Sequence, residues 1–338
     1  MTAQRITLRD VAEAANVSLT AVSFYLNNRA GLSDATRTRI AEAVERLGYV
    51  PRTPTPKLIK SNFIGLLIER LPLSPFADMF YGDVIQGIEL QARTLGYNVA
   101  LMTLEGRPSL AQLFERHNGS LAGLVVLGVG DISTDIIDNV LSEELPTVLV
   151  DTDTHLSMLP SVMPDYLHGA YDAARYLIDK GHQRIAFIQG PTKYHSLVER
   201  FHGYICALVD AGITLDPMLI QASISSGLPN KGYLEMKALL ERQVAFDAIF
   251  CVTDRTALGA LEALREAHIR VPNDVALLSF DNVSQSSHTS PPLTTVDVYK
   301  RELGSNAVDI LHRQISAPSQ QIAVKTLTPT RLVVRKSA

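Results

Sequence analysis

The sequence contains little cysteine, no long apolar run and no evident leader segment. Cys206 and Cys251 are its only cysteines, and they lie in apolar surroundings without the spacing of a metal or redox site. This pattern excludes a disulfide scaffold and predicts reduced thiols in a cytosolic protein. No run approaches the roughly 18 apolar residues that a membrane span needs, and the N-terminus lacks the apolar core of a signal peptide. We therefore expect a cytoplasmic protein without membrane contact.

Recognisable catalytic constellations are also missing. The nine histidines are scattered without metal-ligand spacing, and no Ser/His/Asp arrangement can be seen in the sequence. The segment Gly128-Val129-Gly130 follows an apolar run but lacks the third glycine of a dinucleotide-binding loop, so it predicts a simple turn. We expect no enzymatic activity, no metal and no cofactor.

The net charge of −4 conceals an uneven distribution. Residues 1–60 contain nine basic and five acidic side chains, which gives +4, so the other 278 residues carry 22 basic and 30 acidic ones, which gives −8. A small basic segment on an acidic body favours a polyanion as the partner of that segment.

The basic segment has the signals of three short helices. Thr7 and Asp10 form a capping box, Ser18 precedes a second helical segment, and Ser33 precedes a third over residues 34–47 that ends at Gly48. Two helices joined by a tight turn and followed by a third are typical of a helix-turn-helix unit.

The Pro/Thr-rich residues 51–62 predict an extended linker. Apolar runs then alternate with amphipathic helices, which is typical of βαβ units and of parallel sheets covered by helices on both faces. The expected strands are at 63–68, 97–102, 123–128, 147–151, 184–190, 248–252 and 275–281. There are enough of them for two sheets, so the fold class is α/β, with a three-helix head and a two-lobed body.

The second helical segment has a face suited to reading DNA. Val22 and Leu26 are spaced to point inward, so Thr20 and Phe24 point outward, with Leu19 at the exposed N-terminal end. Hydroxyl and amide side chains near the helix starts suit phosphate contacts. The predicted DNA-binding residues are Thr7, Ser18, Leu19, Thr20, Ser23, Phe24, Asn27 and, in the linker, Leu58.

TLRDVAEAANVSLTAVSFYLN (7–27) and LSDATRTRIAEAVERLGYVP (32–51) resemble the DNA-binding head of the LacI/GalR family of bacterial repressors. The resemblance continues through GHQRIAFIQGP (181–191), CVTDRTALGALEAL (251–264), VPNDVALLSFDN (271–282) and TPTRLVVR (328–335). It implies a homodimer that reads a pseudo-palindromic operator. It also implies a body like a periplasmic binding protein that senses a small molecule, a sugar or related metabolite.

The resemblance divides the chain into a head (1–50), a hinge (51–62) and an effector-binding and dimerisation body (63–338). Within the body we expect lobe one at 63–161 and 293–322, and lobe two at 162–292 and 323–338.

The sequence departs from the family pattern in two places. Phe24 stands where relatives have a polar or basic reader. Phenylalanine contacts thymine methyl groups but cannot hydrogen-bond guanine, so we expect A·T pairs in each half-site; packing of Phe24 on the third helix is the alternative. In the hinge, Leu58 keeps the distance from Pro51 of the leucine that relatives insert into the minor groove. Pro54 and Pro56 disfavour the short helix that presents it.

In the body, Asp151, Thr253, Asp254 and Asp281 each end an apolar run, and the carboxyl ends of parallel strands border ligand crevices. Asp151 and Asp254 have the alternative of capping the helices that follow them. By resemblance, Arg200 and Asp281 align with paired effector contacts, and Phe76 aligns with a lobe-one contact. The predicted ligand-binding residues are Phe76, Asp151, Tyr194, Ser196, Arg200, Thr253 and Asp281.

These observations favour a transcriptional repressor whose operator affinity is controlled by a bound effector. One alternative keeps the DNA-binding head but gives the body a protein coregulator as its partner. A stand-alone sugar-binding module is a further alternative, although the head argues against it.

Overall fold

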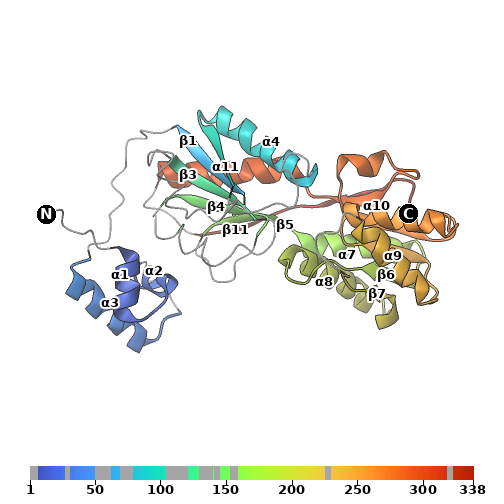
Figure 1. The fold of residues 1–338 in the computed structure, drawn as a ribbon, viewed down its shortest axis with the longest axis horizontal. Coiled ribbons are helices and arrows are strands. Elements are labelled where there is room, and N and C mark those ends of the chain that lie inside the picture. Colours follow the sequence, from blue (N-terminus) through green and yellow to red (C-terminus); the bar gives the residue numbers. More distant parts are fainter. Residues whose placement is uncertain are drawn as a thin grey trace.

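The computed structural model describes residues 7–26, 31–49, 62–68, 79–103, 121–128, 140, 145–152, 159–224, 230–317 and 323–338. The first two ranges form the head, which contains the predicted helices α1 (Leu8–Ala15), α2 (Leu19–Leu26) and α3 (Asp34–Leu47) (Figure 1). Asn27 and residues 51–61, with Leu58, lie outside the described residues, as does Phe76.

The predicted caps of the head are confirmed. Thr7 and Asp10 form the capping box of α1, the Ser18 hydroxyl accepts from the backbone N–H of Ala21, and Ser33 caps α3. Gly48 ends α3 in the left-handed conformation that glycine adopts without strain. The three helices enclose a small core of Val11, Ala12, Ala15, Val22, Ile40 and Ala43.

Lobe one of the body is built on a parallel sheet with the strand order β11-β5-β4-β3-β1-β2. The strands are β1 (Phe63–Ile68), β2 (Asn98–Thr103), β3 (Leu121–Leu127), β4 (Thr147–Val150), β5 (Ser161–Pro164) and β11 (Lys325–Thr328). The apolar strands β1, β3 and β4 are buried almost throughout, as central parallel strands must be. Helices α4 (Met79–Thr94) and α11 (Lys300–Ser316) pack together on one face of this sheet.

Lobe two has a second sheet with the order β12-β10-β9-β8-β6-β7. Its strands are β6 (Ile185–Ile188), β7 (Ile220–Gln221), β8 (Ala248–Cys251), β9 (Ala276–Asp281), β10 (Thr294–Asp297) and β12 (Arg331–Val333). All of its strand pairs are parallel except that of β12 with β10. Helices α7 (Tyr166–Asp179) and α8 (His195–Asp210) cover one face, and α9 (Lys231–Glu241) and α10 (Asp254–Glu266) cover the other. Two 3-10 turns, η1 (Pro217–Leu219) and η2 (Ser284–Ser287), join elements of this lobe.

The lobe boundaries expected from the sequence are each about one strand away from the observed crossings. Residues 162–164 and β11 belong to the sheet of lobe one, and β10 belongs to that of lobe two. The chain therefore crosses between the lobes after Pro164, after Asp297 and after Thr328. The displaced segments contain strands of four residues, which are too short to show a period that identifies their sheet.

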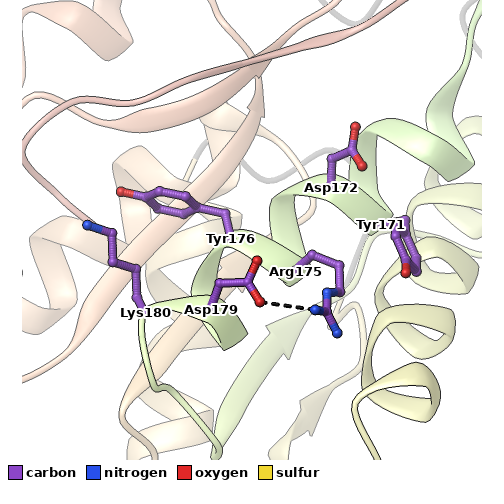
Figure 2. A pocket seen from close by; sticks show the side chains of 6 residues that line it. All are labelled: Tyr171, Asp172, Arg175, Tyr176, Asp179 and Lys180. Atoms are coloured by element: carbon purple, nitrogen blue, oxygen red, sulfur yellow. Dashed lines mark hydrogen bonds and ion pairs between the residues drawn. The ribbon is translucent and has the colours of Figure 1, made fainter.

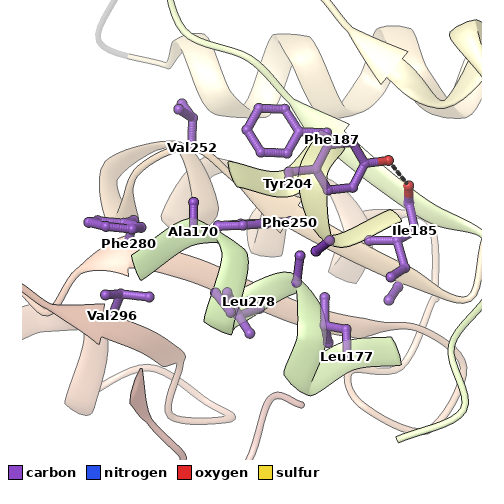
Figure 3. Close-up of a cluster of buried hydrophobic side chains, with 14 of the residues drawn as sticks. Ala170, Leu177, Ile185, Phe187, Tyr204, Phe250, Val252, Leu278, Phe280 and Val296 are labelled. Atoms are coloured by element: carbon purple, nitrogen blue, oxygen red, sulfur yellow. Dashed lines mark hydrogen bonds between the residues drawn. The ribbon is translucent and has the colours of Figure 1, made fainter. Parts of the chain in front are cut away.

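Aromatic side chains fill the core between α7, α8 and the sheet of lobe two. Figure 3 shows Phe187, Tyr204, Phe250 and Phe280 in this core, with the Tyr204 hydroxyl donating to the carbonyl oxygen of Ile185 at 2.8 Å. The hydrogen bond of this phenol therefore stays within lobe two. The close packing of these rings makes lobe two a rigid support for the polar residues at its edge.

Candidate functional site

Arg200 and Asp281 meet in a buried ion pair at the carboxyl edge of the lobe-two sheet. Arg200 lies in the second turn of α8 and Asp281 is the last residue of β9, and Arg200 Nη2 is 2.8 Å from Asp281 Oδ1. The Arg200 Nη1 atom also donates to the carbonyl oxygen of Val252 at 2.7 Å. The structure thus brings together the two residues that the family resemblance paired.

The faces of the Arg200 guanidinium lie against aromatic rings. Its central carbon is 4.0 Å from the ring centroid of Phe280 and 4.8 Å from that of Tyr166. Burial opposes the charged form, but the carboxylate of Asp281 raises the pKa of Arg200 above its usual value, so the side chain stays cationic. The Nε atom of Arg200 has no hydrogen-bond partner among the described residues.

The backbone of Asp281 is strained. Its φ is +110° and that of Asn282 is +50°, a region that side chains other than glycine rarely adopt. The ammonium group of Lys300, at the start of α11, donates to the carbonyl oxygens of Asp281 at 2.6 Å and Asn282 at 2.9 Å. These hydrogen bonds hold the strained turn in place.

Asp151 lies at the matching edge of the lobe-one sheet, directly after β4. Its carboxylate accepts from the hydroxyl of Tyr166, the first residue of α7, and lies 3.2 Å from the hydroxyl of Tyr81 in α4. Burial raises the pKa of Asp151 to about 7, although both tyrosine hydrogen bonds act to lower it. With a φ of +57°, Asp151 is a second strained strand end at this site, and no described contact makes it a helix cap.

Thr253 and Asp254 have structural partners. The Thr253 hydroxyl caps α10 by accepting from the backbone N–H of Thr256, so the cap is Thr253 rather than Asp254. The fully buried carboxylate of Asp254 accepts from the hydroxyls of Ser279 and Thr295 and from the backbone N–H of Val283. Asp254 therefore fixes the ends of β9 and β10 relative to α10.

Tyr194 and Ser196 are half-buried at the start of α8. Tyr194 occupies the N-cap position without capping the helix through its side chain, and the Lys193 ammonium lies 4.8 Å from its ring centroid. Both residues belong to the helix that carries Arg200, but their direct contact with a ligand stays a prediction.

In the head, the residues predicted to read DNA have different surroundings. Leu19 packs against the head core, whereas the packed residues of the described head do not include Phe24. The ring of Phe24 is half-buried beside the turn before α3, and a Cβ atom on Gly31 would lie 3.5 Å from its Cε2 atom. Thr20 and Ser23 are half-exposed on α2, which has no charged side chain.

Sequence reasoning missed Tyr81, Tyr166 and Lys300, which touch the predicted residues. Of these three, only Tyr166 could have been placed from the local sequence, as the first residue of a helix, because Asp165 immediately before it is a typical helix cap. The buried position of Lys300 could not be expected, since lysine is rarely buried unless its ammonium group is hydrogen-bonded.

A pocket of about 430 Å³ lies elsewhere in lobe two. Figure 2 shows that its lining comes from α7 and the C-cap residue that follows it: Tyr171, Asp172, Arg175, Tyr176, Asp179 and Lys180. Arg175 pairs with Asp179, and the two tyrosine hydroxyls bond to Asp210 and to the carbonyl oxygen of Ala338. Since four of its six lining side chains are paired in this way and none is a predicted site residue, this groove is a poor candidate for the effector site.

The described residues contain no group of three or more His, Cys, Asp or Glu side chains placed to hold a metal ion. None of their helices is both long enough and apolar enough to span a membrane.

A helix-turn-helix head on a two-lobed body, with polar residues at the facing strand ends, defines the class of ligand-responsive DNA-binding regulators. Residues 7–52 match the model of bacterial regulatory proteins of the lacI family, and residues 174–338 match the periplasmic binding protein-like domain. The ribose operon repressor of Escherichia coli (strain K12) is 31% identical over 340 residues, which cover 98% of this chain and 99% of that protein. The chain belongs to the LacI family of bacterial transcriptional regulators.

Two solved structures extend the comparison to the whole fold. A complex of the transcriptional regulator CelR with cellobiose aligns at a TM-score of 0.78 and 29% identity, covering 99% of this chain and 100% of that one. The lac repressor dimer bound to operator and the anti-inducer ONPF aligns at a TM-score of 0.70 and 25% identity, covering 99% of each chain. The predicted fold class is thereby confirmed, and these relatives are regulators of transcription.

Proposed function

We propose that this chain is a dimeric, cytoplasmic repressor that binds a pseudo-palindromic operator and responds to a neutral, hydroxyl-rich metabolite, such as a sugar, held between its lobes. The effector would lie beside Arg200 and Asp281, with Asp151, Tyr194, Ser196 and Thr253 around it and Phe76 completing the lobe-one side. The buried Arg200–Asp281 pair carries this proposal. A shift in the relative orientation of the lobes would change the spacing of the two heads.

The charges at the site favour a neutral ligand over an anion. The positive charge of Arg200 already faces Asp281 at 2.8 Å, and the carboxyl group of Asp151 lies close to the same cluster. A phosphate or carboxylate would therefore lie beside two carboxyl groups, while the buried ammonium of Lys300 is already bound to the carbonyl oxygens of Asp281 and Asn282. The free Nε–H of Arg200 and the carboxylate oxygens suit hydroxyl groups, which both accept and donate.

A thermal-shift screen of sugars, sugar phosphates, nucleosides and amino acids tests the proposal. A neutral sugar should raise the unfolding midpoint of the unaltered protein but not that of Arg200→Ala. Arg270→Ala, which removes an exposed lobe-two arginine, is the control and should keep the shift. Stabilisation by phosphorylated sugars alone would contradict the assignment of a neutral ligand. Operator binding without any response to the panel would favour the protein coregulator instead.

The DNA-binding face rests on Thr20, Ser23 and Phe24, with Thr7, Ser18 and Asn27 as phosphate contacts. The position of Phe24 outside the packed head core supports a role in reading bases rather than in folding. Leu19 packs against the head core at the start of α2, so at most the edge of its side chain is available to contact DNA. Minor-groove insertion by Leu58 remains part of the proposal.

Selection of operators from random duplexes tests the role of Phe24. The unaltered protein should enrich A·T pairs opposite residue 24, because the ring contacts thymine methyl groups. Phe24→Arg should shift that position toward guanine. Arg39→Gln, at an exposed position of α3, should weaken binding without changing the selected base. Enrichment of guanine by the unaltered protein would show that Phe24 does not read this position.

A further inference from the structure

Two of the hydrogen-bonded contacts that join the lobes lie next to the Arg200–Asp281 pair. In the first, Asp151 of lobe one accepts from the hydroxyl of Tyr166 in lobe two. In the second, the ammonium of Lys300, on α11 of lobe one, donates to the carbonyl oxygens of Asp281 and Asn282 in lobe two. Each contact lies beside a place where the chain crosses between the sheets.

Each interlobe contact also touches one member of the ion pair. The ring of Tyr166, whose hydroxyl reaches Asp151, stacks against the Arg200 guanidinium. Lys300 binds the backbone of Asp281, whose carboxylate pairs with Arg200. The contacts that the structure gives Arg200 itself are all with lobe-two residues. Apart from its electrostatic interaction with Asp151, Arg200 is thus linked to lobe one through Tyr166 and Asp281.

The backbone at these contacts is held in an unfavourable conformation. Asp151, Asp281 and Asn282 have φ values of +57°, +110° and +50°, and Tyr299, immediately before Lys300, has +49°. Such conformations persist only where surrounding interactions impose them. Loss of either interlobe contact would let these strand ends relax, and the joined arrangement of the lobes would lose support.

We propose that Asp151 and Lys300 are positioning residues that hold the lobes together through opposite ends of the Arg200–Asp281 pair, so that a change at the pair alters the lobe arrangement. The role of an effector in causing that change rests on the function proposed above, but the mechanical link does not. It predicts that substitution of Arg200, whose hydrogen bonds and ring contacts lie within lobe two, moves lobe one.

Distances between spin labels, measured by pulsed electron paramagnetic resonance, test the link without DNA or ligand. One nitroxide is attached at the native, exposed Cys206 of lobe two and the other at Arg313→Cys, an exposed position on α11 of lobe one. Labelled chains are mixed with an excess of unlabelled chains, so that each dimer contains one labelled pair. The unaltered protein should give one narrow distance, and a broad distribution would overturn the proposal.

The decisive variant is Tyr166→Phe, which removes the hydroxyl but keeps the ring on Arg200. Because the substitution leaves the buried carboxyl of Asp151 without this donor, the population with separated lobes should rise about tenfold. The matched control is Tyr204→Phe, which removes a buried phenol hydrogen bond within lobe two and should leave the distance unchanged. If Tyr166→Phe fails to fold by circular dichroism, Asp151→Asn and Lys300→Met test the same two contacts.

Transmission from the ion pair is tested with Arg200→Met. Its distance distribution should broaden like that of Tyr166→Phe, although the hydrogen bonds, ion pair and ring contacts of Arg200 are all with lobe-two residues. Arg242→Met is the control, because Arg242 makes three hydrogen bonds within lobe two and none to the site. Distributions of Tyr166→Phe, Lys300→Met and Arg200→Met that superimpose on that of the unaltered protein would overturn the proposal. Since no ligand is used, a fruitless effector screen leaves this result intact.

Discussion

Removal of one partner of the Arg200–Asp281 pair should strongly destabilise lobe two. The two side chains are only 4% and 11% exposed, so Arg200→Ala leaves the Asp281 carboxylate buried opposite an empty space. It also frees the carbonyl oxygen of Val252 and exposes the faces of two aromatic rings. Breaking a buried ion pair in this way costs about 3–5 kcal/mol, and we expect a loss in that range.

Urea unfolding followed by circular dichroism measures this loss, and a double-mutant cycle assigns it to the pair. Asp281→Asn suits the strained backbone, since asparagine tolerates a positive φ better than most residues. The cycle uses Arg200→Met, Asp281→Asn and the double variant. The double variant should lose about 2 kcal/mol less stability than the sum of the losses of these two single variants, because neither charge is then left unpaired. Arg270→Ala, at an exposed pair, should leave the unfolding midpoint nearly unchanged.

A loss below about 1 kcal/mol for Arg200→Ala, or single changes that add within about 0.5 kcal/mol, would refute this reasoning. Either result would mean that water reaches the carboxylate and replaces the guanidinium. The pair would then contribute to ligand recognition without holding the fold together.

Two further predictions concern packing and pH. Gly87→Ala should destabilise lobe one by about 1–3 kcal/mol in urea unfolding, because its Cβ would overlap the carbonyl oxygen of Arg301 where α4 meets α11. The control is Gly82→Ala, whose Cβ would meet nothing within 4 Å, so its effect on stability should be neutral or stabilising. Equal effects of the two substitutions would contradict the packing argument. The raised pKa of Asp151 means that the folded state binds this proton more tightly than the unfolded chain. Its contribution to stability is therefore present below its ordinary pKa of 3.8 and lost as the pH rises to about 7. The stability of Asp151→Asn relative to the unaltered protein should accordingly increase from about pH 5 to pH 7 and then level off, and a pH-independent difference would contradict the burial of this carboxyl.

Local signals predicted the head almost completely. The caps at Thr7, Ser18 and Ser33 act through hydrogen bonds to residues three positions away, so the information lies within one turn of helix. The central strands could be predicted for a similar reason, since a strand buried on both faces is a continuous apolar run. The short strands near the crossings carry no such pattern, and the lobe boundaries drawn from the sequence were therefore displaced.

The polar site shows where sequence reasoning ends. Strand-end position selected Asp151 and Asp281, and the family resemblance paired Asp281 with Arg200, which the structure places in contact. Nothing local indicated that Tyr166 would complete the acceptor shell of Asp151 while stacking on Arg200, because those contacts arise from the way the chain crosses between two sheets.

Lys300 shows most clearly why the missing residues matter. On its helix it follows a tyrosine and precedes an arginine, an environment that predicts a solvent-exposed lysine. Its burial requires acceptors for the ammonium group, and the strained turn at Asp281 and Asn282 supplies two carbonyl oxygens. The strained turn supplies acceptors for the ammonium group, and the ammonium group holds the turn in its conformation, so neither feature can be predicted without the other. This mutual dependence makes the turn sensitive to the state of the ion pair, because Arg200 holds the side chain of Asp281 while Lys300 holds its backbone carbonyl oxygen.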